Sequence, residues 1–132
     1  MYGDHQPNIT PTYFAPYLDS SDPSSQYQTP FVLWANFDIE ESSEIRMSAN
    51  YITPYLMNTL SQTNYSLPQS SYYQFLSKVQ TEIPVMTTWG YYDANYTYSE
   101  NAPASELYQQ YKYIQYNNVV DKNSIDWTEY YQ

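Results

Sequence analysis

Cysteine is absent from this chain of 132 residues, and basic residues are scarce. Without cysteine there is no disulfide framework and no thiolate metal site. Only four residues are Lys or Arg, against 14 Asp or Glu, so the net charge is −10. Binding to nucleic acid or to anionic lipid needs a basic surface that neutralises phosphates. The composition therefore argues against nucleic acid as a partner and against direct docking on a membrane.

Long apolar runs are missing as well. No run approaches the roughly 18 residues that a membrane helix needs, and no basic region followed by an apolar one opens the chain. We therefore expect neither a membrane span nor a signal peptide in this segment. The length corresponds to about one small domain, and we see no internal repeat and no domain boundary.

One short motif, Gly3-Asp4-His5, combines a scarce residue with two metal-ligand types. His5 is the only histidine and Gly3 is one of two glycines in the chain. A carboxylate oxygen and a neutral imidazole nitrogen are common ligands of Zn²⁺ and Mn²⁺. Neighbouring side chains point to opposite faces of a strand, so both could reach one ion only from a turn. The alternative is an exposed Asp-His pair close to the N-terminus.

The segment after this motif predicts a long loop and then a buried strand. Residues 6–30 are rich in Pro, Ser, Asp and Gln, with one short helical turn expected near Tyr13 to Leu18. We expect this loop to border the candidate metal site. Residues 30–37 form a continuous apolar run of aromatic and β-branched residues after Thr29-Pro30. Such a run predicts a central strand that is covered on both faces.

Three helices follow in the predicted order. The first spans about 53–61, with Thr53 as N-cap and Pro54 at the first helical position. The second spans about 68–83 and ends before Pro84, and the third spans about 105–118 after an N-cap at Ser105. Between the last two, residues 85–89 predict a short strand, 91–95 a turn and 96–98 an edge strand. Residues 121–132 are expected to fray.

Tyrosine is unusually abundant, with 19 residues. Its ring is apolar and its hydroxyl is polar, so it suits half-buried positions and sugar-binding platforms. One interpretation is that tyrosines replace aliphatic residues in a small core. The other is that they form a surface for carbohydrate or for a protein partner.

The order of three segments resembles a known family. Gly3 to Pro7, Thr29 to Ile39 and Ser48 to Leu56 follow one another as in the C-terminal part of a sulfatase-type domain of the alkaline phosphatase superfamily. The chain is most similar to bacterial phosphoglycerol transferases that include lipoteichoic acid synthase. The resemblance implies an α/β fold, namely the C-terminal portion of an alkaline-phosphatase-like α/β/α domain, with residues 1–132 as a single fragment of it.

The resemblance also implies a function. Asp4 and His5 would bind a divalent metal, with Mn²⁺ preferred over Mg²⁺ or Zn²⁺. The full enzyme would act on lipid- or polymer-linked glycerophosphate at the extracellular face of the bacterial cell membrane, during synthesis of envelope polymers. The nucleophilic Thr or Ser, the acidic first ligand and the membrane anchor of that family lie in an N-terminal part that this sequence does not contain. We therefore expect this chain alone to be inactive and its missing N-terminal part to be its main partner.

Two alternatives to the enzyme fragment remain open. The chain could be a non-enzymatic, tyrosine-rich module that binds glycans or a protein. It could also be a degenerate fragment that has no function of its own.

Overall fold

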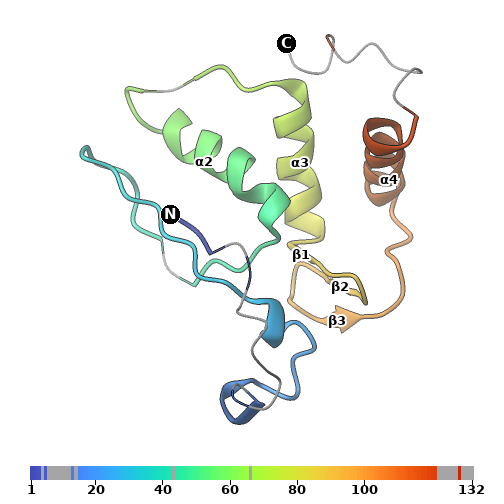
Figure 1. Cartoon of the computed structure of the whole chain (residues 1–132). Helices are drawn as coiled ribbons and strands as arrows, with labels where there is room; N and C mark the ends of the chain where they lie inside the picture. Colours follow the sequence, from blue (N-terminus) through green and yellow to red (C-terminus); the bar gives the residue numbers. More distant parts are fainter. Residues whose placement is uncertain are drawn as a thin grey trace. The chain divides into compact units, whose positions relative to one another are not determined.

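The computed structural model describes residues 1–3, 5, 13, 15–42, 44–65, 67–121 and 128. The chain divides into two compact units, Met1–Phe37 and Asp38–Gln132, and each is considered by itself. The labelled helices and strands all belong to the second unit (Figure 1). Within the described residues, no helix is long and apolar enough to cross a membrane.

The first unit is built from turns and one antiparallel contact. Two 3-10 turns, η1 (Ala15–Tyr17) and η2 (Ser25–Tyr27), occupy the part of the expected loop that is described. Residues 1–3 run antiparallel to residues 30–32, with a β-bridge between Tyr2 and Phe31. The predicted helical turn near Tyr13 to Leu18 is thus confirmed as η1. Residues 6–12 of the loop lie outside the described part.

The predicted buried strand over 30–37 is wrong in its extent and its burial. Apart from the bridge at Phe31, this run forms no regular strand. Its side chains alternate between half-buried and exposed positions, and Val32 and Trp34 are 58% and 80% exposed. A continuous apolar run cannot by itself distinguish a strand covered on two faces from an extended segment with one open face. Here the segment has one open face.

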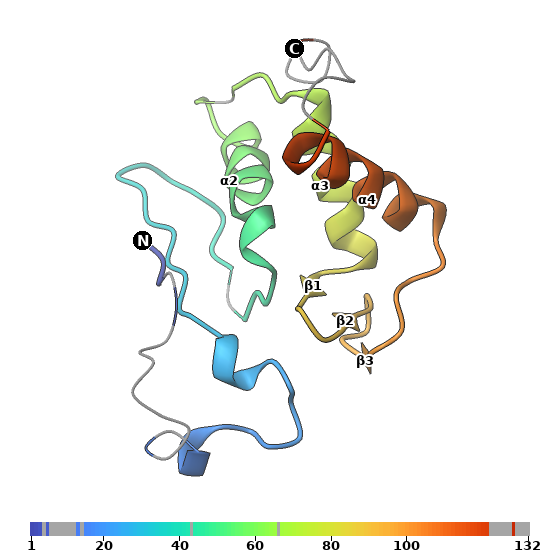
Figure 2. The same cartoon turned by 45° about the vertical axis from the view of Figure 1, so that its right-hand side comes forward.

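The second unit contains three helices and a small sheet (Figure 2). The helices are α2 (Ile52–Ser61), α3 (Ser71–Glu82) and α4 (Glu106–Val119), and a 3-10 turn, η3 (Ala49–Tyr51), leads into α2. The sheet consists of β1 (Val85–Met86), β2 (Tyr91–Tyr92) and β3 (Tyr98–Ser99), all antiparallel in the order β1-β2-β3. The expected mixture of helix and strand is present, and the described sheet is small and antiparallel.

The three predicted helices are confirmed, with shifted ends. Ser70 and Ser105 accept hydrogen bonds from the backbone N–H groups of Tyr73 and Tyr108, so serine N-caps open α3 and α4. Thr53 is not the N-cap of α2. The 3-10 turn η3 ends at Tyr51, and α2 begins directly after it at Ile52, one residue before Thr53. Pro84 cannot continue a helix, and α3 ends at Glu82, two residues before it.

The predicted turn over 91–95 is partly wrong, because Tyr91 and Tyr92 form the central strand β2. The true turn begins at Asp93, whose carboxylate accepts hydrogen bonds from the N–H groups of Asn95 and Thr97. Tyr96 does not join a strand either. It adopts a left-handed conformation with φ 57°, which completes the turn before β3.

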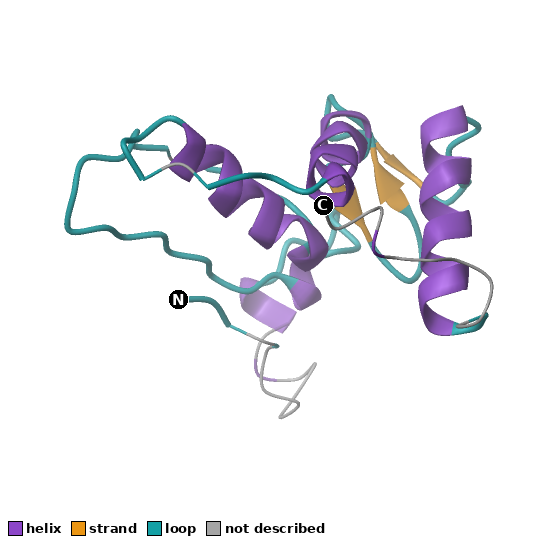
Figure 3. Cartoon of the chain, turned by 90° about the horizontal axis from the view of Figure 1, so that it is seen from above, coloured by secondary structure: helices purple, strands orange, loops and turns teal. Residues whose placement is uncertain are grey.

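The core of the second unit lies where η3, α3 and β1 meet. Tyr51, Leu76 and Val79 are buried together, and half-buried side chains from the sheet and α4 pack against them. The Tyr51 hydroxyl donates a hydrogen bond of 3.0 Å to the Ile83 carbonyl oxygen. This bond satisfies the polar tip of a ring that is otherwise fully enclosed. Helix α2 packs against α3, and Figure 1 and Figure 3 together show the strands beyond the C-terminal end of α3.

Candidate functional site

The predicted metal-ligand motif follows directly after a paired segment. The Met1 amino group donates a hydrogen bond to the Val32 carbonyl oxygen at 2.7 Å, and the Val32 N–H donates to the Met1 carbonyl oxygen at 2.8 Å. The Gly3 N–H then donates to the Pro30 carbonyl oxygen at 2.9 Å. His5 is exposed two residues later. Asp4 lies outside the described residues.

Gly3 allows this pairing because a larger residue would crowd the neighbouring segment. A Cβ atom added to Gly3 would lie 3.1 Å from the Cβ atom of Thr29, closer than ordinary van der Waals contact. The glycine therefore serves the close approach of two backbone segments, in addition to any role beside an ion.

The described residues do not form a complete metal centre. In the part of the chain that the structure describes, no group of three or more His, Cys, Asp or Glu side chains gathers around a common point. Catalytic metal ions are normally held by three or more protein ligands. An ion at Asp4 and His5 would therefore need at least one further ligand.

Two aspartates of the long loop organise its turns. An Asp19 carboxylate oxygen accepts hydrogen bonds from the N–H and the hydroxyl of Ser21, at 2.8 and 2.6 Å. An Asp22 oxygen does the same for Ser24, at 2.9 Å for both bonds. Such side-chain turns fix loop geometry. These carboxylates thus have a structural role, and Ser24 is buried as a result.

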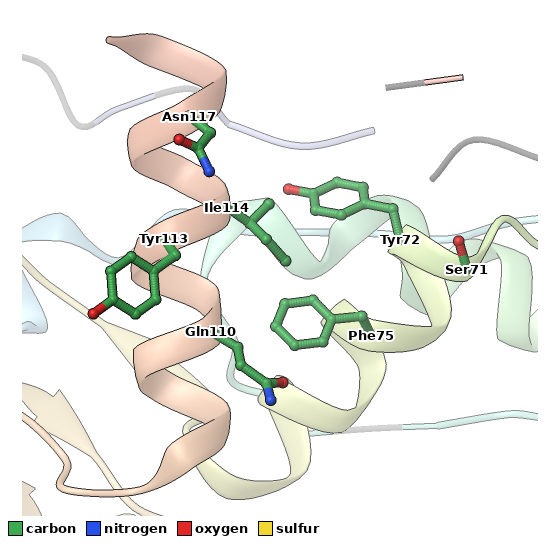
Figure 4. Close-up of a pocket in the computed structure, with 7 residues that line it drawn as sticks. All are labelled: Ser71, Tyr72, Phe75, Gln110, Tyr113, Ile114 and Asn117. Atoms are coloured by element: carbon green, nitrogen blue, oxygen red, sulfur yellow. The ribbon is translucent and has the colours of Figure 1, made fainter. Parts of the chain in front are cut away.

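A pocket of about 350 Å³ opens between α3 and α4 in the second unit. It is lined by residues from both helices: Ser71, Tyr72, Phe75, Gln110, Tyr113, Ile114 and Asn117. Phe75 and Ile114 extend toward each other across the space between the helices, with Tyr72 beside them (Figure 4). The lining is contributed by residues three or four apart on each helix, which share one face. The pocket thus has an apolar floor and a polar rim.

Hydrogen bonds fix one wall of this pocket. The Tyr72 hydroxyl accepts a hydrogen bond of 3.1 Å from the Gln115 side-chain amide, which ties α4 to α3. The Gln110 amide donates to a Glu106 carboxylate oxygen at 3.3 Å, one turn earlier on α4. The hydrogen bond between Gln115 and Tyr72 therefore contributes to the spacing of the two helices that line the pocket.

Tyr108 and Tyr111 of the second unit have a raised side-chain pKa. The rings of Tyr91 and Tyr108 meet edge to face at 5.2 Å, and their hydroxyl groups share a hydrogen bond of 2.5 Å. Burial raises the pKa of the Tyr108 hydroxyl above its ordinary value, and the bond to Tyr91 raises it further. Burial also raises the pKa of Tyr111. Neutral tyrosines of this kind stabilise a packed region and are poor nucleophiles at neutral pH.

Sequence reasoning did not identify the pocket. The sequence predicts helices that contain Phe75 and Ile114, but no local signal shows that side chains of the two helices enclose a pocket. No family model, no curated protein and no solved structure matches this chain.

Proposed function

We propose that this chain is the C-terminal part of a metal-dependent phosphoglycerol transferase or sulfatase-like hydrolase with an alkaline-phosphatase-like domain. In this proposal Asp4 and His5 contribute two ligands for a divalent ion, with Mn²⁺ preferred. The substrate is a glycerophosphate head group on a lipid or polymer, at the outer face of a bacterial membrane. The remaining ligands and the nucleophile come from the N-terminal part of the same domain.

The observation that supports the proposal most directly is the pairing of residues 1–3 with residues 30–32. It brings together two of the three segments on which the family resemblance depends, and it holds the residue before the Asp-His pair against the apolar run. The exposure of His5 is compatible with an imidazole that a metal can reach. His5 follows a backbone segment whose hydrogen bonds limit the further ordering that ion binding requires.

A bound divalent ion would polarise a phosphoryl oxygen of the substrate. The described residues do not supply a complete ligand set, and no Thr or Ser of this chain is assigned as the nucleophile. The contribution of this chain is thus limited to holding one side of the site. Its acidic surface, with a net charge of −10, disfavours anionic head groups unless the ion offsets that charge.

The first test uses the single histidine as a probe. Added Mn²⁺ should broaden the imidazole proton NMR signals of His5 at concentrations below about 1 mM. Asp4→Asn should weaken this effect clearly, whereas the matched change Asp38→Asn should leave it unchanged. Broadening that is absent, or equal in the two variants, would remove the metal-ligand pair from the proposal.

The second test concerns the coding sequence directly upstream of Met1. The proposal expects an in-frame stretch with a Thr or Ser nucleophile and an acidic metal ligand. The joined protein should transfer or hydrolyse glycerophosphate in a Mn²⁺-dependent reaction, and His5→Ala in that protein should abolish the activity. An upstream sequence without these residues, or full activity of the variant, contradicts the assignment.

A further inference from the structure

We propose that the pocket between α3 and α4 is a binding site for a neutral sugar ring. This inference concerns residues far in sequence from the metal-ligand motif, and it does not depend on the proposed enzymatic function. It rests on the shape of the pocket, on the chemistry of its lining and on the charge of the chain.

The size of the pocket suits one small ligand. Its volume of about 350 Å³ lies near the lower end of the range for ligand clefts, about 300–1,000 Å³. Gln110 and Tyr113 at its rim are exposed, and Phe75 and Ile114 at its floor are half-buried. A ligand can therefore enter from solvent and reach an apolar surface without rearrangement of the helices.

The lining combines aromatic faces with uncharged polar groups. Phe75 and Tyr72 offer ring surfaces, on which the C–H face of a pyranose can pack. The amides of Gln110 and Asn117 carry both donors and acceptors, which match the hydroxyl groups of a sugar. A sugar ring has this same combination of one apolar face and a polar edge.

The charge of the lining residues favours a neutral sugar over an anionic or a cationic ligand. The lining residues that the structure describes include no acidic or basic side chain. An anionic ligand such as a phosphate or a sugar acid would find no cation in the pocket, and it would meet a chain with a net charge of −10. A cation would find no carboxylate among the lining residues. A neutral glycoside therefore suits this lining better than an anionic or a cationic ligand does.

The test uses the methyl β-glycosides of glucose and N-acetylglucosamine as probes, with methyl glucuronide as the anionic comparison. In ¹H–¹⁵N spectra, at least one neutral probe should shift the side-chain amide signals of Gln110 and Asn117 saturably, with a Kd on the order of 1 mM. The glucuronide should bind at least about tenfold more weakly. Equal shifts from the glucuronide, or no saturable shift from any neutral probe, would overturn the proposal.

Two variants locate the site, and one variant serves as control. Phe75→Leu keeps an apolar side chain but removes the ring, and Gln110→Ala removes an exposed amide whose hydrogen bond, to Glu106, lies within α4. Each should weaken binding by about tenfold, with unchanged helix content by circular dichroism. Tyr116→Ala removes an exposed tyrosine of the same helix that does not line the pocket, and it should bind as the parent does. Equal loss in all three variants, or in none, contradicts the assigned site.

Discussion

The two units of this chain keep their shapes by different means. In the second unit, every buried apolar residue of the described chain lies between Tyr51 and Tyr108, and three helices pack around them. Among the described residues of the first unit, only Ser24 is buried, and an aspartate-centred turn encloses it. Apolar burial therefore dominates in the second unit, and polar turns dominate in the first unit.

This difference predicts how strongly substitutions should destabilise each unit. Burial of an apolar side chain contributes about 1.5–3 kcal/mol, whereas a typical hydrogen bond contributes about 0.5–1.5 kcal/mol net. The second unit should therefore unfold cooperatively. The first unit leaves Tyr2, Val32 and Trp34 exposed, so its contribution to the free energy of unfolding should be small. The predictions below test this contrast.

The largest expected effect comes from the core. Leu76→Ala should lower the free energy of unfolding by about 2–5 kcal/mol, because it leaves a cavity beside Tyr51 and Val79. Urea unfolding followed by the circular dichroism of the helices measures this loss. Val32→Ala, at an exposed apolar position in the first unit, should change the same quantity by less than about 0.5 kcal/mol. Similar losses in the two variants would contradict the comparison.

The two glycines of the chain provide a matched pair, one in each unit. A Cβ atom at Gly90 would lie 2.6 Å from the Ser99 carbonyl oxygen and 2.6 Å from the Tyr98 ring. Gly90→Ala should therefore cost about 1–3 kcal/mol as the strands move apart. At Gly3 the nearest atom is a side-chain carbon at 3.1 Å, so Gly3→Ala should cost less than Gly90→Ala. Thermal unfolding midpoints rank the two, and the reverse order would count against the contrast.

Alkaline pH should weaken the second unit selectively. Burial raises the pKa of the Tyr51 hydroxyl well above its ordinary value of 10.0. Between that value and the folded pKa, the unfolded chain loses the Tyr51 proton and the folded chain keeps it. Stability is therefore fully present below pH 10 and should fall above it by up to about 1.4 kcal/mol per pH unit from this residue.

Tyr51→Phe isolates this titration. At pH 7 the variant should be less stable by about 1–3 kcal/mol, because the Ile83 carbonyl oxygen loses its hydrogen bond from the hydroxyl. Above pH 10 its stability should decline less steeply than that of the parent. Urea midpoints measured across this pH range give both values, and parallel slopes would exclude Tyr51 as the titrating group.

The smallest expected effect concerns a helix cap. Ser105→Ala removes the hydrogen bond from the Tyr108 N–H and should cost about 1 kcal/mol in urea unfolding. Asp22→Ala removes a comparable turn in the first unit, where its carboxylate holds Ser24 and Gln28. Helix unfolding should hardly respond to Asp22→Ala. A response as large as that of Ser105→Ala would mean that the two units unfold together.

Local sequence signals were sufficient to predict the three helices. Ser105 before Glu106, and Pro84 after an amphipathic run, mark helix ends through interactions within a few residues. The strands were harder, because their position depends on contacts across the chain. Tyr91 and Tyr92 resemble turn residues in a sequence window, yet pairing with β1 and β3 makes them the central strand. The apolar run at 30–37 lacked any local signal that one of its faces stays open.

The two candidate sites also differ in how far the sequence could predict them. His5 could be identified from the sequence because its residue type carries the chemistry, and it lies in an exposed position. Whether Asp4 joins it stays a prediction, because Asp4 is outside the described residues. The pocket between α3 and α4 depends on side chains about 40 positions apart in the sequence that meet only after the helices pack. No spacing rule within one segment could have indicated it.

The serine at position 48 covers the backbone of an edge strand. Its hydroxyl accepts a hydrogen bond from the Met86 N–H at 2.7 Å and donates one to the Met86 carbonyl oxygen at 3.1 Å. A single side chain thereby forms hydrogen bonds with both backbone groups of Met86, on the edge strand β1. Unsatisfied groups on an edge strand recruit strands from other molecules. Ser48 thus leaves neither backbone group of Met86 open for pairing with a strand of another molecule.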